Sequence, residues 1–194
     1  MTLITLVRHG QTDWNLARRI QGATDVPLNE TGRADARAAA ELLAGDAHHA
    51  VYASPLVRAH ETARIIADHL ALGEPALVPD MRERTFGDGE GLLVEQYLER
   101  FGDWHAVVPG AETLDEVGDR ALAALDVIAR DARRRSAPTV ESVIVVTHGG
   151  VIRSILNRVS SGSLPREGEM LRNGSVHRFE AAPDVLRLLD VVAL

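Results

Sequence analysis

Two short apolar runs constrain the fold of this chain more than any other feature of its sequence. Residues 2–7 are rich in β-branched side chains and are followed by Arg8 and His9, and residues 142–147 have the same character and are followed by His148. Such runs are typical of strands that are buried on both faces of a sheet. If the two strands are parallel, their carboxyl ends meet at one edge of the sheet and both histidines lie there.

Strand and helix patterns alternate along the rest of the chain. Shorter strand candidates lie at residues 50–53, 76–78, 175–180 and 186–192. Helix candidates lie at residues 30–44, 55–70, 114–128 and 151–159. This alternation predicts an α/β fold, a three-layer α/β/α sandwich with a mostly parallel central sheet. Sheets of this kind bind their ligands at the carboxyl ends of the strands.

Three of these helices begin with recognisable capping signals. Asn29 can cap the first helix, and Ser54 can cap the second with Pro55 in its first turn. Thr113 and Glu116 have the spacing of a capping box ahead of a long amphipathic segment. These residues predict where the helices start.

The length of the chain suits a single domain. A chain of 194 residues that is 45% hydrophobic can bury one substantial core, so we expect one domain over residues 1–194. Residues 86–110 form the only long stretch without a clear pattern, and they are rich in glycine and aromatic side chains. We expect this stretch to be a short, partly helical cap segment over the site.

Composition and charge exclude several classes of function. The net charge of −7 opposes general binding to nucleic acid or to an anionic membrane. Cysteine and lysine are both absent, which removes thiolate chemistry, lysine Schiff bases and lysine-containing phosphate loops. The first apolar run is too short for a signal peptide or a membrane span, so we expect a cytoplasmic protein.

Four basic or imidazole side chains are expected to gather where the two long strands end. Arg8, His9 and His148 follow the strands directly, and Arg58 can reach the same edge from the first turn of its helix. Because guanidinium groups bind phosphate oxygens in pairs, this grouping indicates an anion site. Taken alone, Arg58 could equally form a surface salt bridge.

Ordered motifs extend this pattern over nearly the whole chain. In sequence order they are residues 6–15, 21–22, 25–28, 31–32, 54–59, 62–63, 82–83, 86–87, 90–91, 146–153 and 173–176. Together they resemble the histidine phosphatase superfamily, also called the phosphoglycerate mutase-like family. The resemblance implies the phosphoglycerate mutase-like version of the sandwich fold and a phosphoryl-transfer enzyme.

The resemblance also implies roles for individual residues. His9 would be the nucleophile that becomes a phosphohistidine, and Glu83 would be the general acid and base. The phosphoryl oxygens would be held by Arg8, Asn15, Arg58, His148 and Gly149. Independently of these roles, we expect the alcohol part of the substrate to touch the cap, so candidates for contact with it are Gln21, Gly22, Phe86, Trp104 and His105.

Elementary chemistry agrees with the roles of the two catalytic side chains. A neutral imidazole is a competent nucleophile if its other nitrogen donates to a fixed acceptor, and a strand-end carbonyl can be that acceptor. A bound phosphate disfavours the charged form of Glu83, which leaves a protonated acid for the leaving group. The alternative is that Glu83 only pairs with Arg82 or Arg84.

Some positions depart from the family pattern or have no counterpart in it. Gly89 stands where an aromatic residue is common, and we expect its small size to widen or reshape the pocket. Ala111 replaces a frequent glycine, and we expect the adjacent Glu112 only to help start the following helix through its dipole. Three histidines are expected on the surface, namely His48, His49 and His69, whereas His60 and His177 have no matching role.

The preferred function is hydrolysis of a small phosphorylated metabolite without metal or cofactor. The chain is compact, whereas mutases that act on phosphoglycerate are larger, so phosphoglycerate mutase-type transfer is the main alternative. A metal-dependent hydrolase is less favoured because no closely spaced ligand pair is present. A non-catalytic phosphate-binding protein is also less favoured, because every matched catalytic position is intact. The oligomeric state stays open.

Overall fold

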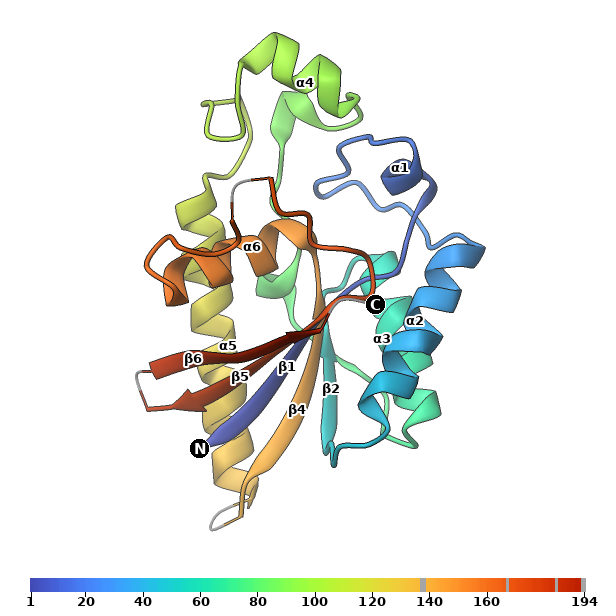
Figure 1. The fold of residues 1–194 in the computed structure, drawn as a ribbon, viewed down its shortest axis with the longest axis vertical. Coiled ribbons are helices and arrows are strands. Elements are labelled where there is room, and N and C mark those ends of the chain that lie inside the picture. The colour runs from blue at the N-terminus through green and yellow to red at the C-terminus, as the bar shows by residue number, and fades with distance from the viewer. Residues whose placement is uncertain (137–138, 167, 184, 193–194) are drawn as a thin grey trace.

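The structure, a computed structural model, describes residues 1–136, 139–166, 168–183 and 185–192. Across these residues a six-stranded sheet forms the middle of three layers, in the order β3-β2-β4-β1-β5-β6 (Figure 1). The strands are β1 Thr2–Arg8, β2 Ala50–Ala53, β3 Ala76–Leu77, β4 Glu141–Thr147, β5 Val176–Ala182 and β6 Val185–Val192. Each predicted strand is present, with ends within two residues of the expected ones.

The sheet is parallel on one side and antiparallel on the other. Strands β3, β2, β4 and β1 run parallel, whereas β5 is antiparallel to β1 and β6 is antiparallel to β5. The predicted α/β sandwich with a mostly parallel sheet is therefore confirmed. The sequence analysis did not predict that β5 and β6 are antiparallel, because an apolar run does not reveal the direction of its strand.

Helices cover both faces of the sheet. They are α1 Asp13–Leu16, α2 Glu30–Leu43, α3 Val57–His69, α4 Val94–Phe101, α5 Leu114–Ser136 and α6 Gly149–Val159, with short 3-10 turns at Pro79–Met81 and Gly87–Gly89. Helices α2 and α3 pack on one face, and α5 and α6 pack on the other (Figure 1). The side chains of the strands alternate between these two cores, so each face of the sheet buries its own hydrophobic cluster. None of the helices in the described ranges is both long and apolar enough to cross a membrane.

Two of the three predicted helix caps are confirmed. The side chain of Asn29 accepts a hydrogen bond of 2.9 Å from the backbone of Gly32 at the start of α2. Thr113 and Glu116 bond each other reciprocally at 2.8 Å and 3.1 Å, which is the capping box expected before α5. These bonds satisfy backbone N–H groups that have no partner within the helix.

The predicted cap of α3 is wrong. The helix begins at Val57 with Leu56 as its N-cap, no side chain caps it, and Pro55 lies before it rather than in its first turn. The hydroxyl of Ser54 is instead within 2.7 Å of an imidazole nitrogen of His148. The start of α6 is also earlier than expected, at Gly149 rather than Val151.

Residues 86–110 stand away from the sheet and contain α4, at the far end of the molecule in Figure 1. Together with Ile20 from the loop after α1, they form a small hydrophobic core in which Ile20, Tyr97 and Val108 are buried. Backbone hydrogen bonds of 2.9 Å and 2.8 Å, from Ile20 to Leu92 and from Val94 to Arg18, attach this stretch to the loop after α1. That residues 1–194 form one domain with this stretch as its cap stays a prediction.

Candidate active site

The carboxyl ends of β1 and β4 coincide. Arg8 pairs with Thr147 in the parallel ladder, and the next N–H, that of His9, donates to the carbonyl of Thr147 at 2.9 Å. His9 and His148 therefore leave the sheet side by side, and their ring centroids are 5.1 Å apart. Both rings are buried. The predicted convergence of the two histidines is confirmed.

The hydrogen bond of His9 fixes its tautomer. Nδ1 lies 2.7 Å from the carbonyl oxygen of Gly10, and because a carbonyl can only accept, Nδ1 carries the proton. Burial, reinforced by the positive charges of Arg58 and Arg8, holds the pKa of His9 well below its usual value of 6.5. The ring is therefore neutral near pH 7, and Nε2 has a free lone pair.

The segment that follows His9 is fixed from several sides. The N–H of Gly10 donates to the hydroxyl of Thr62 on α3 at 3.1 Å, and Asn173 donates to the carbonyl of His9 at 2.9 Å. A Cβ on Gly10 would come within 2.1 Å of the carbonyl oxygen of Gly32, so only glycine fits there. This close packing holds the His9 ring in one orientation.

The ring of His148 is oriented by Ser54. The hydroxyl oxygen of Ser54 accepts a hydrogen bond of 3.3 Å from the N–H of Leu56, so its own proton is free to be donated to Nε2 of His148 at 2.7 Å. Burial, followed by the charge of Arg58, holds the pKa of His148 well below 6.5, so this ring is also neutral. Nδ1 then carries the proton, and within the described residues it has no hydrogen-bond partner.

Arg58 is buried rather than exposed. Its side chain makes no ion pair within the described ranges, and its guanidinium donates to the carbonyls of Thr24 and Gly22 at 2.9 Å and 2.8 Å. Burial lowers the pKa of Arg58, although the negative charges of Glu83 and two other carboxylates partly offset this. The surface salt bridge considered for Arg58 is therefore absent among these residues.

Arg8 is the last residue of β1, directly before His9, and it is partly buried. Its Nη1 donates to the carbonyl of Leu171, and burial lowers its pKa. A Cβ on Gly149 would lie 3.3 Å from Nε of Arg8, so the small size of this glycine lets the guanidinium lie close against the start of α6. Nε of Arg8 is buried and has no partner among the residues that the structure describes.

Glu83 projects from the loop between β3 and α4 toward the same place. Its two carboxylate oxygens accept hydrogen bonds from the N–H groups of Arg84 at 2.8 Å and of Gly150 at 3.1 Å. Arg82 pairs with Glu112 instead, and Arg84 donates to backbone carbonyls, one of them that of Trp104 at 2.9 Å. The alternative in which Glu83 only pairs with these arginines is therefore wrong within the described residues.

Glu112 does more than start a helix, so the expectation for this residue is wrong. Its carboxylate accepts hydrogen bonds from Arg120 at 2.8 Å and 2.9 Å and from the N–H of Thr85 at 3.0 Å. Burial opposes the charge, but the hydrogen bonds from Arg120 and Thr85 outweigh it, and the pKa of Glu112 is lowered. Arg120 also donates to the carbonyl of Glu83 at 3.1 Å, so this ion pair anchors the loop that carries Glu83.

Gly89 reshapes the cap rather than widening the pocket. A Cβ at this position would lie 2.6 Å from the ring of Tyr97, which is fully buried. Tyr97 stacks on Trp104 with ring centroids 5.2 Å apart and meets Phe86 edge-on at 5.9 Å. The room that glycine leaves is thus filled by an aromatic cluster within the cap.

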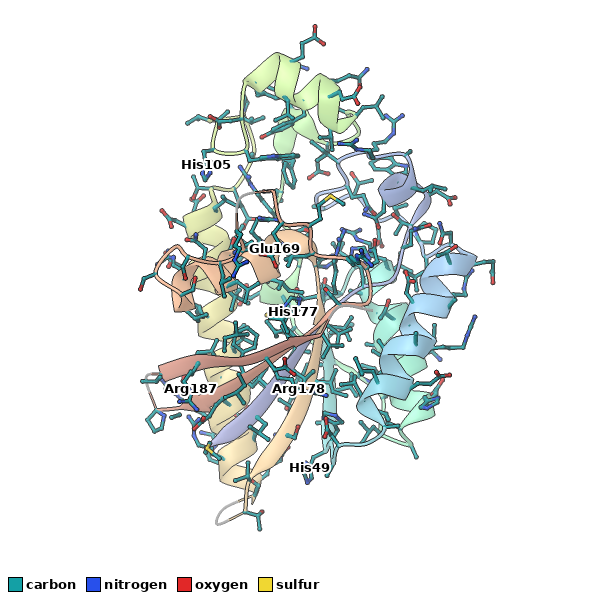
Figure 2. The ribbon with its side chains drawn as sticks, viewed as in Figure 1. His49, His105, Glu169, His177, Arg178 and Arg187 are labelled. Atoms are coloured by element: carbon teal, nitrogen blue, oxygen red, sulfur yellow. The ribbon has the colours of Figure 1, made fainter. Side chains whose placement is uncertain are left out.

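A cavity of about 140 Å³ opens between the strand ends and the cap. Its walls are formed by Arg8, His9, Asn15, Arg19, Ile20, Gln21, Gly22, Arg58, Glu83, Phe86 and Trp104. Three site residues predicted from the sequence do not line it. The ring of His148 is buried beside that of His9, and Gly149 packs against Arg8. His105, labelled in Figure 2, is exposed on the loop after α4.

Asn15 lines the cavity, and its amide oxygen is held by neighbouring residues. Its amide oxygen accepts hydrogen bonds from the N–H of Thr12 at 3.1 Å and from the side chain of Asn173 at 3.3 Å. Because the oxygen is occupied in this way, the NH2 group is the part that can donate to an anion.

The remaining histidines lie outside the cavity. His49 and His69 are exposed as expected, and Figure 2 shows His49 at the end of the molecule opposite His105. His48 is half-buried beside the hydroxyl of Ser142 at 3.1 Å, so its expected surface position is wrong. His177 is fully buried on β5, and burial lowers its pKa to about 4.

Sequence reasoning missed several residues of this site. Arg19 lines the cavity, Asn173 holds His9, and Ser54 orients His148, but none of them was given such a role. Ser54 and Asn173 both lie within matched motifs, so a signal was present for these two. Across the described ranges, no cluster of three or more histidine, cysteine, aspartate or glutamate side chains is arranged to hold a metal ion.

Comparison with known proteins gives a consistent picture. The family model of the histidine phosphatase superfamily (branch 1) matches residues 4–193. The chain is 37% identical to the uncharacterized phosphatase PhoE of Bacillus subtilis over 98% of its length and 94% of that protein. It is 39% identical to a metal-independent phosphoserine phosphatase of Arabidopsis thaliana, over 91% of its length and 75% of that protein.

A solved structure agrees with these relatives. Bacillus stearothermophilus YhfR superposes with a TM-score of 0.83 at 29% identity, covering 97% of this chain and 95% of that one. The range matched by the family model includes both strand ends and the loop that carries Glu83. The chain belongs to the histidine phosphatase superfamily, branch 1.

Proposed function

We propose that the protein hydrolyses small phosphomonoesters through a phosphohistidine formed on Nε2 of His9. The observation that carries the proposal is the state of this ring at the cavity wall. It is neutral, its tautomer is fixed by the carbonyl of Gly10, and its free nitrogen lies in a cavity lined by Arg8 and Arg58. Membership of a phosphatase family supports the same reaction.

In the first step Nε2 of His9 attacks phosphorus and the bond from phosphorus to the ester oxygen breaks. The leaving alkoxide takes a proton from Glu83, which lines the same cavity. Charge on the phosphoryl oxygens is stabilised by Arg8 and Arg58 and by the Nδ1–H of His148. Since these groups are held by the fold before the substrate arrives, they act without the cost of reorganisation.

In the second step the phosphohistidine is hydrolysed. Glu83, now a carboxylate, takes a proton from water, the water oxygen attacks phosphorus, and the bond from phosphorus to His9 breaks. Inorganic phosphate leaves, and Glu83 is again protonated for the next cycle. The N–H groups of Arg84 and Gly150 hold the carboxylate in place through both steps.

The other cavity residues suit contact with the phosphate and with the alcohol part of the substrate. The NH2 group of Asn15 donates to a phosphoryl oxygen in this proposal. Gln21, Gly22, Phe86 and Trp104 form the remaining wall and contact the alcohol part. Gly149 contributes by allowing the close approach of Arg8.

Trapping the intermediate tests the proposal. Mixing the enzyme with a ³²P-labelled phosphomonoester and quenching it with alkali is expected to leave label on the protein that is stable to base and lost in acid. His9→Ala is expected to abolish both the label and the turnover. Undiminished turnover by the alanine variant, with thermal unfolding like that of wild type, would refute the role of His9.

Vanadate provides an independent test of the pocket. It can adopt the five-coordinate geometry of phosphoryl transfer, so it is expected to inhibit far more tightly than phosphate does. Glu83→Gln is expected to lower kcat much more than it weakens vanadate inhibition. Indifference of the enzyme to vanadate would contradict the proposed pocket.

Transfer to a second substrate hydroxyl, as in a phosphoglycerate mutase, is separated from hydrolysis by its products. With 3-phosphoglycerate we expect release of inorganic phosphate and no isomerised phosphoglycerate.

The expected independence from metal is tested by assaying after treatment with a chelator, which should leave activity unchanged. The cytoplasmic location expected from the sequence stays a prediction.

A further inference from the structure

A third arginine lines the cavity, and the proposed phosphate site does not use it. Arg19 forms part of the wall together with Arg8 and Arg58. Its Nη1 donates to the carbonyl of Gly91, and among the described residues no carboxylate lies within ion-pair distance of its guanidinium. This cation therefore faces the cavity without a neutralising partner from these residues.

Arg19 lies at the end of the wall that faces the cap. Residues 19–22 form one continuous strip of this wall, and the carbonyl of Gly22 at one end is held by Arg58 at 2.8 Å. At the other end Arg19 forms an isolated antiparallel bridge with Leu93 of the cap. Three residues of chain span at most about 10 Å, so Arg19 is within reach of a small substrate bound at Arg58.

The guanidinium of Arg19 lies over the ring of Trp14, 5.7 Å from its centroid, and the described lining adds no ion pair to it. Among the described residues that line the cavity, Glu83 is the only acidic one, and it lies with the phosphate-binding groups beside Gly150. The carboxylate of Glu90 lies outside this lining, where it accepts hydrogen bonds from the N–H groups of Ala23 and Phe86. Phe86 and Trp104 supply aromatic surface and no charge. In a chain with a net charge of −7, an arginine in such a place focuses a local positive field on the alcohol part of the substrate.

The geometry points to Arg19 as the binding group for a second anion, a carboxylate on the alcohol part of the phosphomonoester. This inference rests on the proposed function and adds a substrate class to it. With Nη1 held by Gly91, the edge formed by Nε and Nη2 remains, and it can make two parallel hydrogen bonds to a carboxylate. A cavity of about 140 Å³ that already receives a phosphoryl group favours a carboxylate over a second, bulkier phosphate.

Two ligands that differ only by a carboxylate provide the test. Phosphoserine and phosphoethanolamine share the phosphate, the ester and the amine, and only phosphoserine carries the carboxylate. Each is used as a competitor of p-nitrophenyl phosphate hydrolysis, which gives an inhibition constant whether or not the competitor is turned over. In the wild type, phosphoserine should inhibit about 10- to 100-fold more tightly, as expected for hydrogen bonds between charged groups.

Arg19→Gln should remove most of this preference, because glutamine keeps a polar side chain but loses the charge and the fork. Arg19→Lys should restore part of it, because lysine keeps the charge without the paired geometry. Arg18→Gln is the matched control, since Arg18 is the exposed neighbour that does not line the cavity, and it should keep the wild-type preference.

The outcomes separate this inference from the proposed function. If the wild type does not hydrolyse p-nitrophenyl phosphate, the proposed function fails. If it does, but the two competitors bind equally, the assignment of Arg19 is overturned and hydrolysis stands. The assignment would also be overturned if Arg19→Gln raised the inhibition constants of phosphoserine and phosphoethanolamine by the same factor, because the wild-type preference would then be retained.

Discussion

A single methyl group placed on Gly150 should displace Glu83 without unfolding the protein. A Cβ at this position would lie 2.4 Å from Oε1 of Glu83 and 3.2 Å from its Cδ. The atom that must move is the end of a flexible side chain, so the fold can accommodate the change. Because Gly150 lies in the first turn of α6, alanine should even favour the helix, by up to about 1 kcal/mol.

The size of the effect follows from the distance that the carboxylate must move. An ordinary contact between these atoms is about 3.4 Å, so Oε1 has to retreat by about 1 Å from the position that it occupies beside Gly150. A misplacement of this size in a catalytic group costs about 100-fold in rate. We therefore expect Gly150→Ala to lower kcat/KM for an alkyl phosphomonoester by about 100-fold, or about 2.7 kcal/mol.

The choice of leaving group isolates the role of Glu83. An alkoxide needs a proton as it leaves, whereas p-nitrophenolate is a weak base that leaves without one. The loss in kcat/KM should therefore be large for glycerol phosphate and small for p-nitrophenyl phosphate. Gly45→Ala, where a Cβ has nothing within 4 Å, is the matched control and should change neither value. An equal loss for both esters in Gly150→Ala would refute the reasoning.

Three further predictions concern residues around the site. Ser54→Ala removes the donor to Nε2 of His148, so kcat and the affinity for vanadate should both fall about tenfold. Ser54→Thr keeps the hydroxyl and should retain both values. Unchanged vanadate affinity in the alanine variant would count against a proton on Nδ1 of His148. Glu112→Gln leaves the half-buried Arg120 without a carboxylate, so urea unfolding should show a loss of about 2 kcal/mol. The value of kcat should also fall, because the loop that carries Glu83 loses its support. Burial lowers the pKa of His177 to about 4 in the folded state. Between pH 6.5 and pH 4 the unfolded state therefore binds a proton that the folded state does not. This residue should lower the free energy of unfolding by about 3 kcal/mol as the pH drops through that range. His177→Leu should show a shallower loss in urea unfolding over that range, and an unchanged slope would contradict the assignment.

The fold was largely predictable because its signals are local. The strands β1 and β4 each appear as one uninterrupted apolar run, and the box formed by Thr113 and Glu116 marks the start of α5 within four residues. Strand direction is not a local property, and the antiparallel hairpin of β5 and β6 was therefore not foreseen. The parallel pairing of β1 with β4 followed from the alternation with helices.

The site was predictable only where its residues lie directly after strands or within familiar motifs. The contact between Ser54 and His148 joins residues 94 positions apart, and a capping role looked equally reasonable for that serine from its neighbours alone. The role of Glu112 was equally hard to predict, because its contact with Thr85 joins residues 27 positions apart. Arg19 gave no signal at all, since one arginine in an arginine-rich chain is not distinctive until the cavity is known.

The small core around Tyr97, Ile20 and Val108 has a consequence for how enzymes of this design diversify. His9 and His148 follow the strands, whereas Phe86 and Trp104 in the cavity wall belong to residues 86–110, which share this core with Ile20 from the loop after α1. A related protein's version of residues 86–110 is therefore expected to change which alcohol is accepted only when its counterpart of Ile20 is exchanged with it, because the core is otherwise left without one of its members.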